Sequence, residues 1–135
     1  MELAPNSDEG PRRLGQAYLN AGKKDEAIAA FTKATEVNPH FWRNFTLLGN
    51  AYFELGANDK ALAMCRKVTD LEPDLASGWA NLGAAYYRLG DFTQSTAAFQ
   101  KAIDRQPNPV YYSQMGTAYF LAATTRSRCP ILKRR

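Results

Sequence analysis

The chain repeats itself every 34 residues, and this period restricts the fold more than any other feature of the sequence. The repeated prolines are Pro5, Pro39, Pro73 and Pro107. Three further sets of residues recur at the same interval: Gly15, Gly49 and Gly83; Gly22, Gly56 and Gly90; and Tyr18, Tyr52 and Tyr86. A fixed period of this length is typical of repeat proteins, in which each unit is one supersecondary element that stacks on its neighbours.

Each unit is predicted to consist of two helices. Apolar residues with helical spacing, such as Ala27, Ala30, Phe31 and Ala34, lie between one turn glycine and the next proline. The glycine register beginning at Gly22 marks the turn between the two helices, because a left-handed residue is favoured there. The prolines end the second helix of each unit. Helices are predicted over residues 8 to 21, 24 to 37, 42 to 55, 58 to 71, 76 to 89, 92 to 105 and 109 to 122.

The residues at fixed positions of the period resemble the tetratricopeptide repeat (TPR), whose 34-residue unit is a helix-turn-helix. Counting position one at Asp8, Trp42 and Ala76, positions seven and eight are Leu14-Gly15, Leu48-Gly49 and Leu82-Gly83, and position twenty-four is Phe31, Cys65 and Phe99. Pro11, Cys65 and Ser95 depart from the pattern, and we expect each to weaken local packing. The resemblance implies an all-α, right-handed superhelical solenoid of antiparallel helix pairs, with three TPR motifs and one unpaired C-terminal helix.

The period also predicts the domain organisation. Residues 1 to 7 are predicted as the remnant of a preceding repeat, 8 to 41 as the first TPR, 42 to 75 as the second and 76 to 108 as the third. Residues 109 to 123 form the first helix of an incomplete fourth TPR, and residues 124 to 135 form a basic, disordered tail. Of the 17 basic residues, five lie in 126 to 135, which leaves 12 basic and 13 acidic residues in the remainder. The net charge of +4 therefore belongs to the tail.

In TPR arrays one face of the first helices lines a concave groove that binds peptides, so the resemblance implies a groove here. Its apolar row consists of Leu19, Phe53, Tyr87 and Phe120, among amide and hydroxyl side chains. Amides at such a face bind an extended backbone without reading its sequence. The predicted peptide-binding residues are Arg12, Gln16, Asn20, Arg43, Asn50, Phe53, Asn81, Tyr87, Arg88 and Thr117.

One TPR subfamily holds the acidic C-terminus of heat-shock chaperones in a clamp of two lysines, an arginine and two asparagines. Asn50 and Asn81 match its asparagine positions. Its basic positions correspond to Thr46, Val110 and Gln114, which cannot neutralise a carboxylate. We therefore do not expect strong specificity for a C-terminal carboxylate.

No residue pattern predicts catalysis, a cofactor or a metal site. His40 has no neighbouring cysteine or second histidine, and no phosphate-binding loop or nucleophile motif is present. Cys65 occupies a packed repeat position, where burial suppresses thiol reactivity. Two cysteines, no signal peptide and no apolar run of membrane-spanning length predict a cytoplasmic chain.

We expect a non-catalytic protein-protein interaction scaffold. The main alternative is a regulatory or substrate-recruiting TPR segment of a larger enzyme, such as a glycosyltransferase of the O-linked N-acetylglucosamine type. A nucleic-acid partner for the basic tail is a third, weaker hypothesis. Homo-oligomerisation through helix 109 to 122 is also expected, with Tyr112, Met115 and Tyr119 packed on the preceding pair and Leu121 and Ala122 left exposed.

Overall fold

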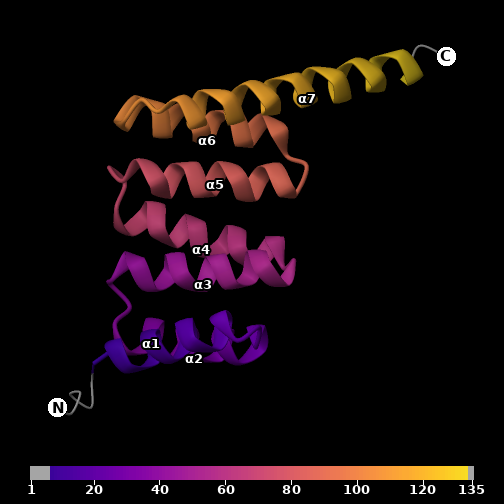
Figure 1. Cartoon of the computed structure of the whole chain (residues 1–135). Coiled ribbons are helices and arrows are strands. Elements are labelled where there is room, and N and C mark those ends of the chain that lie inside the picture. Colours follow the sequence, from indigo (N-terminus) through magenta and orange to yellow (C-terminus); the bar gives the residue numbers. More distant parts are fainter. Residues whose placement is uncertain (1–6, 134–135) are drawn as a thin grey trace. The chain divides into compact units, whose positions relative to one another are not determined.

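The computed structural model describes residues 7 to 133, with side chains as far as Thr124. All the regular elements in this part of the chain are α-helices (Figure 1). They are α1 (Glu9–Asn20), α2 (Lys24–Val37), α3 (Trp42–Leu55), α4 (Asn58–Leu71), α5 (Ala76–Arg88), α6 (Phe92–Arg105) and α7 (Pro109–Lys133). The predicted remnant of a preceding repeat lies outside the described residues, except for its last residue, Ser7.

The turns between paired helices confirm the role predicted for the glycines. Gly22, Gly56 and Gly90 have φ angles of 79°, 84° and 83°, which are strained for any residue with a side chain. The second helices then begin with an acidic residue at or near their first turn, and Asp91 caps α6 by accepting a hydrogen bond from the Gln94 amide at 3.2 Å. The six helices before α7 consequently match their predicted bounds to within one residue at each end.

Helix α7 is longer than the sequence predicted. The expected helix ended at residue 122 and was followed by a disordered tail, whereas α7 continues to Lys133. No glycine or proline lies between Gly116 and Pro130, so no residue in this stretch breaks the helix.

The chain divides into two compact units, residues 1 to 73 and 74 to 135. In the first unit α1, α2, α3 and α4 pack in chain order, around a core that includes Phe31 and Leu48. In the second unit α5, α6 and α7 pack in chain order, around a core that includes Phe99 and Ala102. Each unit therefore contains its own buried cluster.

A small residue at repeat position eight makes room for an aromatic ring from the paired helix. A Cβ atom built on Gly15 would lie 2.6 Å from the Phe31 ring, and one on Gly83 would lie 3.0 Å from the Phe99 ring. A Cβ on Gly49 would lie 3.3 Å from Met64 Cβ. Gly116 differs, because no described atom lies within 4 Å of the corresponding position.

Gly15→Ala and Gly116→Ala are therefore expected to change stability in opposite directions. The first substitution forces a methyl group into the buried Phe31 ring, which should lower the free energy of unfolding by about 1 to 3 kcal/mol. The second replaces glycine in an open helical position, which should raise stability by roughly 0.5 to 1 kcal/mol. Urea unfolding followed by circular dichroism measures both, and a gain in stability from Gly15→Ala would contradict the packing described.

The three departures from the repeat pattern are accommodated locally. Ser95 is fully buried, and its hydroxyl donates a 2.8 Å hydrogen bond to the Gly83 carbonyl, so this polar group is satisfied. Pro11 lies in the first turn of α1, where a missing backbone N–H removes no helical hydrogen bond. Cys65 is buried, as predicted, and burial raises the pKa of its thiol to about 12.

Cys65→Ser is expected to lower the free energy of unfolding by roughly 1 to 3 kcal/mol, because the hydroxyl would be poorly hydrogen-bonded in a packed site. In the unmodified chain the neutral, buried thiol should react with iodoacetamide only when the fold opens. Mass spectrometry of Cys65 labelling against urea concentration checks this. Rapid labelling of Cys65 in the native chain would show that the thiol is accessible.

Several packing assignments predicted for α7 are wrong. Tyr112 and Tyr119 are 52% and 57% exposed, whereas Leu121 and Ala122, which were expected to be exposed, are half-buried. Met115 packs against the second core, as predicted. At roughly 100° per residue Tyr112 and Tyr119 lie to one side of Met115, whereas the fully buried Ala118 lies to the other side, and this places the two tyrosines at the edge of the packed face.

Candidate functional site

The predicted groove residues of the first unit lie on α1 and α3. Gln16 and Asn20 are exposed, and the Gln16 side-chain amide donates a 3.1 Å hydrogen bond to Asn20 Oδ1. The Arg43 guanidinium lies 5.1 Å from the centroid of the Trp42 ring, a cation–π contact. Asn50 is exposed and Phe53 is half-buried. This face therefore presents amides and one guanidinium.

Arg12 has a structural partnership that the sequence did not predict. Its Nη1 donates to Asp8 Oδ2 at 2.7 Å and to Asn44 Oδ1 at 3.2 Å. The Asn44 side-chain amide donates to the same Asp8 oxygen at 2.7 Å and to the Ala34 carbonyl at 3.2 Å. Arg12 also lies 5.3 Å from the centroid of the Phe41 ring. Much of its hydrogen-bonding capacity is thus used within the fold.

This cluster controls the ionisation of Asp8. Burial is the largest single effect and raises the pKa of Asp8, but the hydrogen bond from Asn44, the charge of Arg12 and further hydrogen bonds from the backbone and Arg12 together lower this pKa by more. The net result is a pKa below its ordinary value of 3.8. Asp8 is therefore ionised at neutral pH, and the cluster joins α1 to α3 through a partly buried electrostatic contact.

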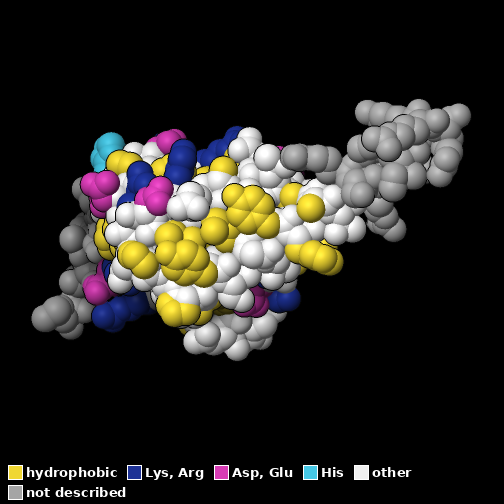
Figure 2. Space-filling view, turned by 90° about the horizontal axis from the view of Figure 1, so that it is seen from above, with side chains coloured by type: hydrophobic (Ala, Val, Ile, Leu, Met, Phe, Trp, Pro, Cys, Tyr) yellow, Lys and Arg dark blue, Asp and Glu magenta, His cyan; other side chains and the backbone are white. Residues whose placement is uncertain are grey.

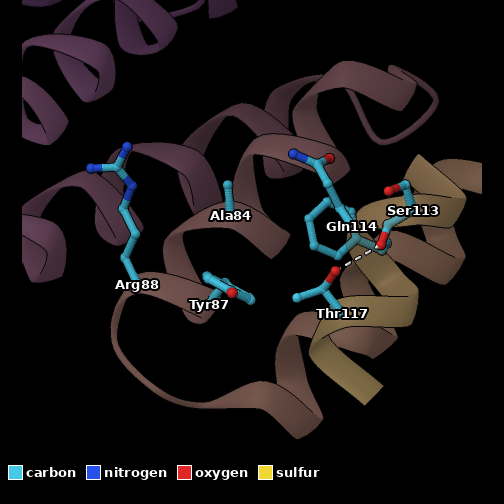
Figure 3. Close-up of a pocket in the computed structure, with 7 residues that line it drawn as sticks. Ala84, Tyr87, Arg88, Ser113, Gln114 and Thr117 are labelled. Atoms are coloured by element: carbon cyan, nitrogen blue, oxygen red, sulfur yellow. Dashed lines mark hydrogen bonds between the residues drawn. The ribbon is translucent and has the colours of Figure 1, made fainter. Parts of the chain in front are cut away.

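In the second unit three predicted groove residues meet around one hollow of about 380 Å³ (Figure 3). They are Tyr87 and Arg88 from α5 and Thr117 from α7. The hollow is also lined by Ala84, Phe99, Ser113 and Gln114. Asn81 does not line it. Of these residues Ala84 lies on α5, Phe99 on α6, and Ser113 and Gln114 on α7.

The lining combines an apolar base with polar walls. Phe99 is almost fully buried, and Tyr87 stacks edge-on against Phe92 with ring centroids 5.4 Å apart. Thr117 donates a 3.1 Å hydrogen bond to the Ser113 carbonyl. Figure 3 shows the α5 and α7 side chains on opposite sides of the hollow, with the Arg88 guanidinium directed away from α7. Such a lining suits an apolar side chain whose adjacent peptide groups form hydrogen bonds.

In the part of the chain that the structure describes, no helix is both long enough and apolar enough to cross a bilayer. The histidine, cysteine, aspartate and glutamate side chains of the same part form no group of three placed to hold a metal ion.

Comparison with known proteins identifies the family to which the chain belongs. A sequence model described as TPR repeat matches residues 49–90, and one described as tetratricopeptide repeat matches residues 12–41 and 76–109. The chain belongs to the tetratricopeptide repeat family, and its fold is the all-α helical solenoid of that family. A search of curated proteins gave no match.

Solved structures agree with this assignment. The first TPR of Spaghetti (RPAP3), bound to the HSP90 peptide SRMEEVD, is 21% identical, with a TM-score of 0.80 over 90% of this chain and 99% of that one. The first TPR domain of human RPAP3 is 22% identical, with a TM-score of 0.83 over 92% and 98%. The Sgt2 TPR domain from Aspergillus fumigatus is 18% identical, with a TM-score of 0.81 over 93% and 88%.

Proposed function

We propose that this chain is a protein-interaction scaffold that binds an extended peptide on the face presented by its first helices. The observation that carries the proposal is the hollow of about 380 Å³ in the second unit, lined by Tyr87, Arg88 and Thr117. Its volume is large enough for one or two peptide side chains and lies at the small end of the range for ligand pockets. Asn50, in the first unit, and Asn81, in the second, are each proposed to contact a peptide backbone through their side-chain amides.

The side chains around the hollow favour an apolar anchor in the peptide. The RPAP3 domain, a structural relative, is bound to an HSP90 peptide, which supports peptide binding as the general activity. In this chain the positions that supply cations in the chaperone clamp hold Thr46, Val110 and Gln114. We therefore propose that an internal apolar residue is the main determinant, with Arg88 favouring an acidic residue beside it.

The experiment is a selection of random peptides by phage display on the full chain, followed by calorimetric titration of the selected peptides. Thr117→Arg places a long cationic side chain at the hollow and is expected to weaken binding by roughly tenfold or more. Thr124→Arg is the matched control, since Thr117 and Thr124 are both exposed on α7 and each donates a hydrogen bond to the carbonyl four residues earlier. Equal loss in both variants would contradict the assigned site.

Two further measurements test the partner chemistry. Asn50→Ala combined with Asn81→Ala is expected to weaken the selected peptides while leaving helicity unchanged. The peptide SRMEEVD is expected to bind more weakly than the selected peptides, because the clamp cations are missing. Unchanged affinity in the double variant would rule out the proposed role of the asparagines. Preferential binding of SRMEEVD would show that a carboxylate, and not an apolar residue, is the main determinant.

A further inference from the structure

One side of α7 carries an apolar strip with no described partner. The α7 strip consists of Tyr112, Gly116, Tyr119, Phe120 and Ala123, which share one side of the helix at roughly 100° per residue. Tyr112, Tyr119 and Phe120 are 52%, 57% and 70% exposed. Figure 2, which views the molecule from above α7, shows apolar side chains gathered on this face. Exposed patches of this kind mark interaction sites.

The α7 strip lies in an uncharged segment. Residues 109 to 125 contain no aspartate, glutamate, lysine or arginine, although this part of α7 spans more than four turns. Depletion of charge is typical of the core of a protein interface. Because the strip carries no charges, two identical strips can pack together with no repulsion between like charges.

The paired helices of this chain show what covers such a strip. Gly15 and Gly83, at repeat position eight, each receive a phenylalanine ring from the neighbouring helix, whereas Gly116 at the same position has open space. A further hollow of about 160 Å³ beside the strip is lined by Thr93, Thr96, Tyr119, Ala122 and Ala123. The strip therefore has open space at Gly116, where the equivalent glycines of the paired helices are covered, and a second helix can approach closely there.

We propose that the α7 strip binds the same strip of a second copy of this chain, with the two α7 helices antiparallel about a two-fold axis beside Gly116. The strip is self-complementary about that glycine, since Tyr112 precedes it by four residues and Phe120 follows it by four. Each Tyr112 then faces Phe120 of the second copy, and the two glycines allow close approach. Such self-complementarity is what a two-fold interface requires.

The exposed area of the α7 strip indicates how tightly two copies of the chain should associate. Three aromatic rings that are each about half exposed supply roughly 300 Å² per copy, or about 600 Å² for the pair. Stable interfaces bury about 1,200 Å² or more. The dimer is therefore weak, with a dissociation constant in the roughly micromolar to millimolar range, and it exchanges with the monomer. This inference does not depend on peptide binding.

Sedimentation equilibrium of the full chain over micromolar to millimolar concentrations tests the proposal. The mass should rise from monomer toward dimer with concentration. Phe120→Asp should weaken association by roughly tenfold or more, because it removes a ring and places a carboxylate against an apolar surface. Val110→Asp is the control, since Val110 is 57% exposed on α7 but lies off the strip. The Val110→Asp chain should associate as strongly as the unmodified chain.

A mixing experiment tests the antiparallel register. Phe120→Asp and Tyr112→Lys chains should each stay monomeric, but their mixture should form a heterodimer in which the introduced carboxylate faces the introduced ammonium group. Circular dichroism confirms that both variants fold. A constant monomer mass of the unmodified chain, association that Phe120→Asp leaves intact, or a mixture that remains monomeric would overturn the proposal.

Discussion

Phe99→Ala is expected to lower the free energy of unfolding by about 3 to 5 kcal/mol, the range for removing a fully buried aromatic ring. Phe99 is 1% exposed and packs with Ala80 and Ala102, and its ring fills the space left by Gly83. A domain of this size is stabilised by only about 5 to 15 kcal/mol in total. The loss should therefore be visible as a large shift of the urea midpoint, measured by circular dichroism.

Phe120→Ala provides the control for this prediction. The two phenylalanines have the same side chain, but Phe120 is 70% exposed, so its truncation should change stability by less than about 0.5 kcal/mol in dilute, monomeric protein. Equal losses at the two positions would mean that Phe99 is not a core residue. Phe99 also lines the hollow, so Phe99→Ala should weaken peptide binding as well as lower the stability of the chain.

Asn44→Ala is expected to cost about 2 to 4 kcal/mol, because several buried groups lose a partner at once. Asn44 is fully buried and its amide donates to Asp8 and to the Ala34 carbonyl, while its oxygen accepts from Arg12. Thermal and urea unfolding measure the effect. Asn50→Ala, an exposed amide on the same helix, is the control and should change stability by less than about 0.5 kcal/mol.

The same substitution should alter the acid dependence of stability. The folded-state pKa of Asp8 is below its ordinary value of 3.8, so this carboxylate stabilises the native state above about pH 4 and loses that contribution as pH falls through the folded-state pKa. In Asn44→Ala the hydrogen bond that lowers the pKa is absent while burial remains. The fall in stability between roughly pH 5 and pH 2 should therefore be smaller than in the unmodified chain. An identical pH profile would show that Asn44 does not control Asp8.

Local features of the sequence determined the helices and their order. The turn glycines, the prolines and the apolar spacing act on residues that are close to them in the sequence. Their effects can therefore be predicted without knowing which other parts of the chain pack against them. Positive φ at Gly22, Gly56 and Gly90 is the clearest example. The 34-residue period then identified the repeat family and the face on which Tyr87, Arg88 and Thr117 meet.

The tertiary structure decided which side chains are engaged and which remain available. The Asp8–Arg12 ion pair is a local i,i+4 contact. Arg12 also reaches Asn44, 32 residues away, and Asn44 reaches Asp8, 36 residues away, so no local pattern shows that this groove arginine is tied to α3. The period places Gly15, Gly83 and Gly116 at one equivalent position, yet only the first two are covered by a ring. The orientation of α7 likewise depends on how Met115 and Ala118 meet the second core. A repeat pattern specifies equivalent positions, whereas burial depends on the neighbour that each position actually has.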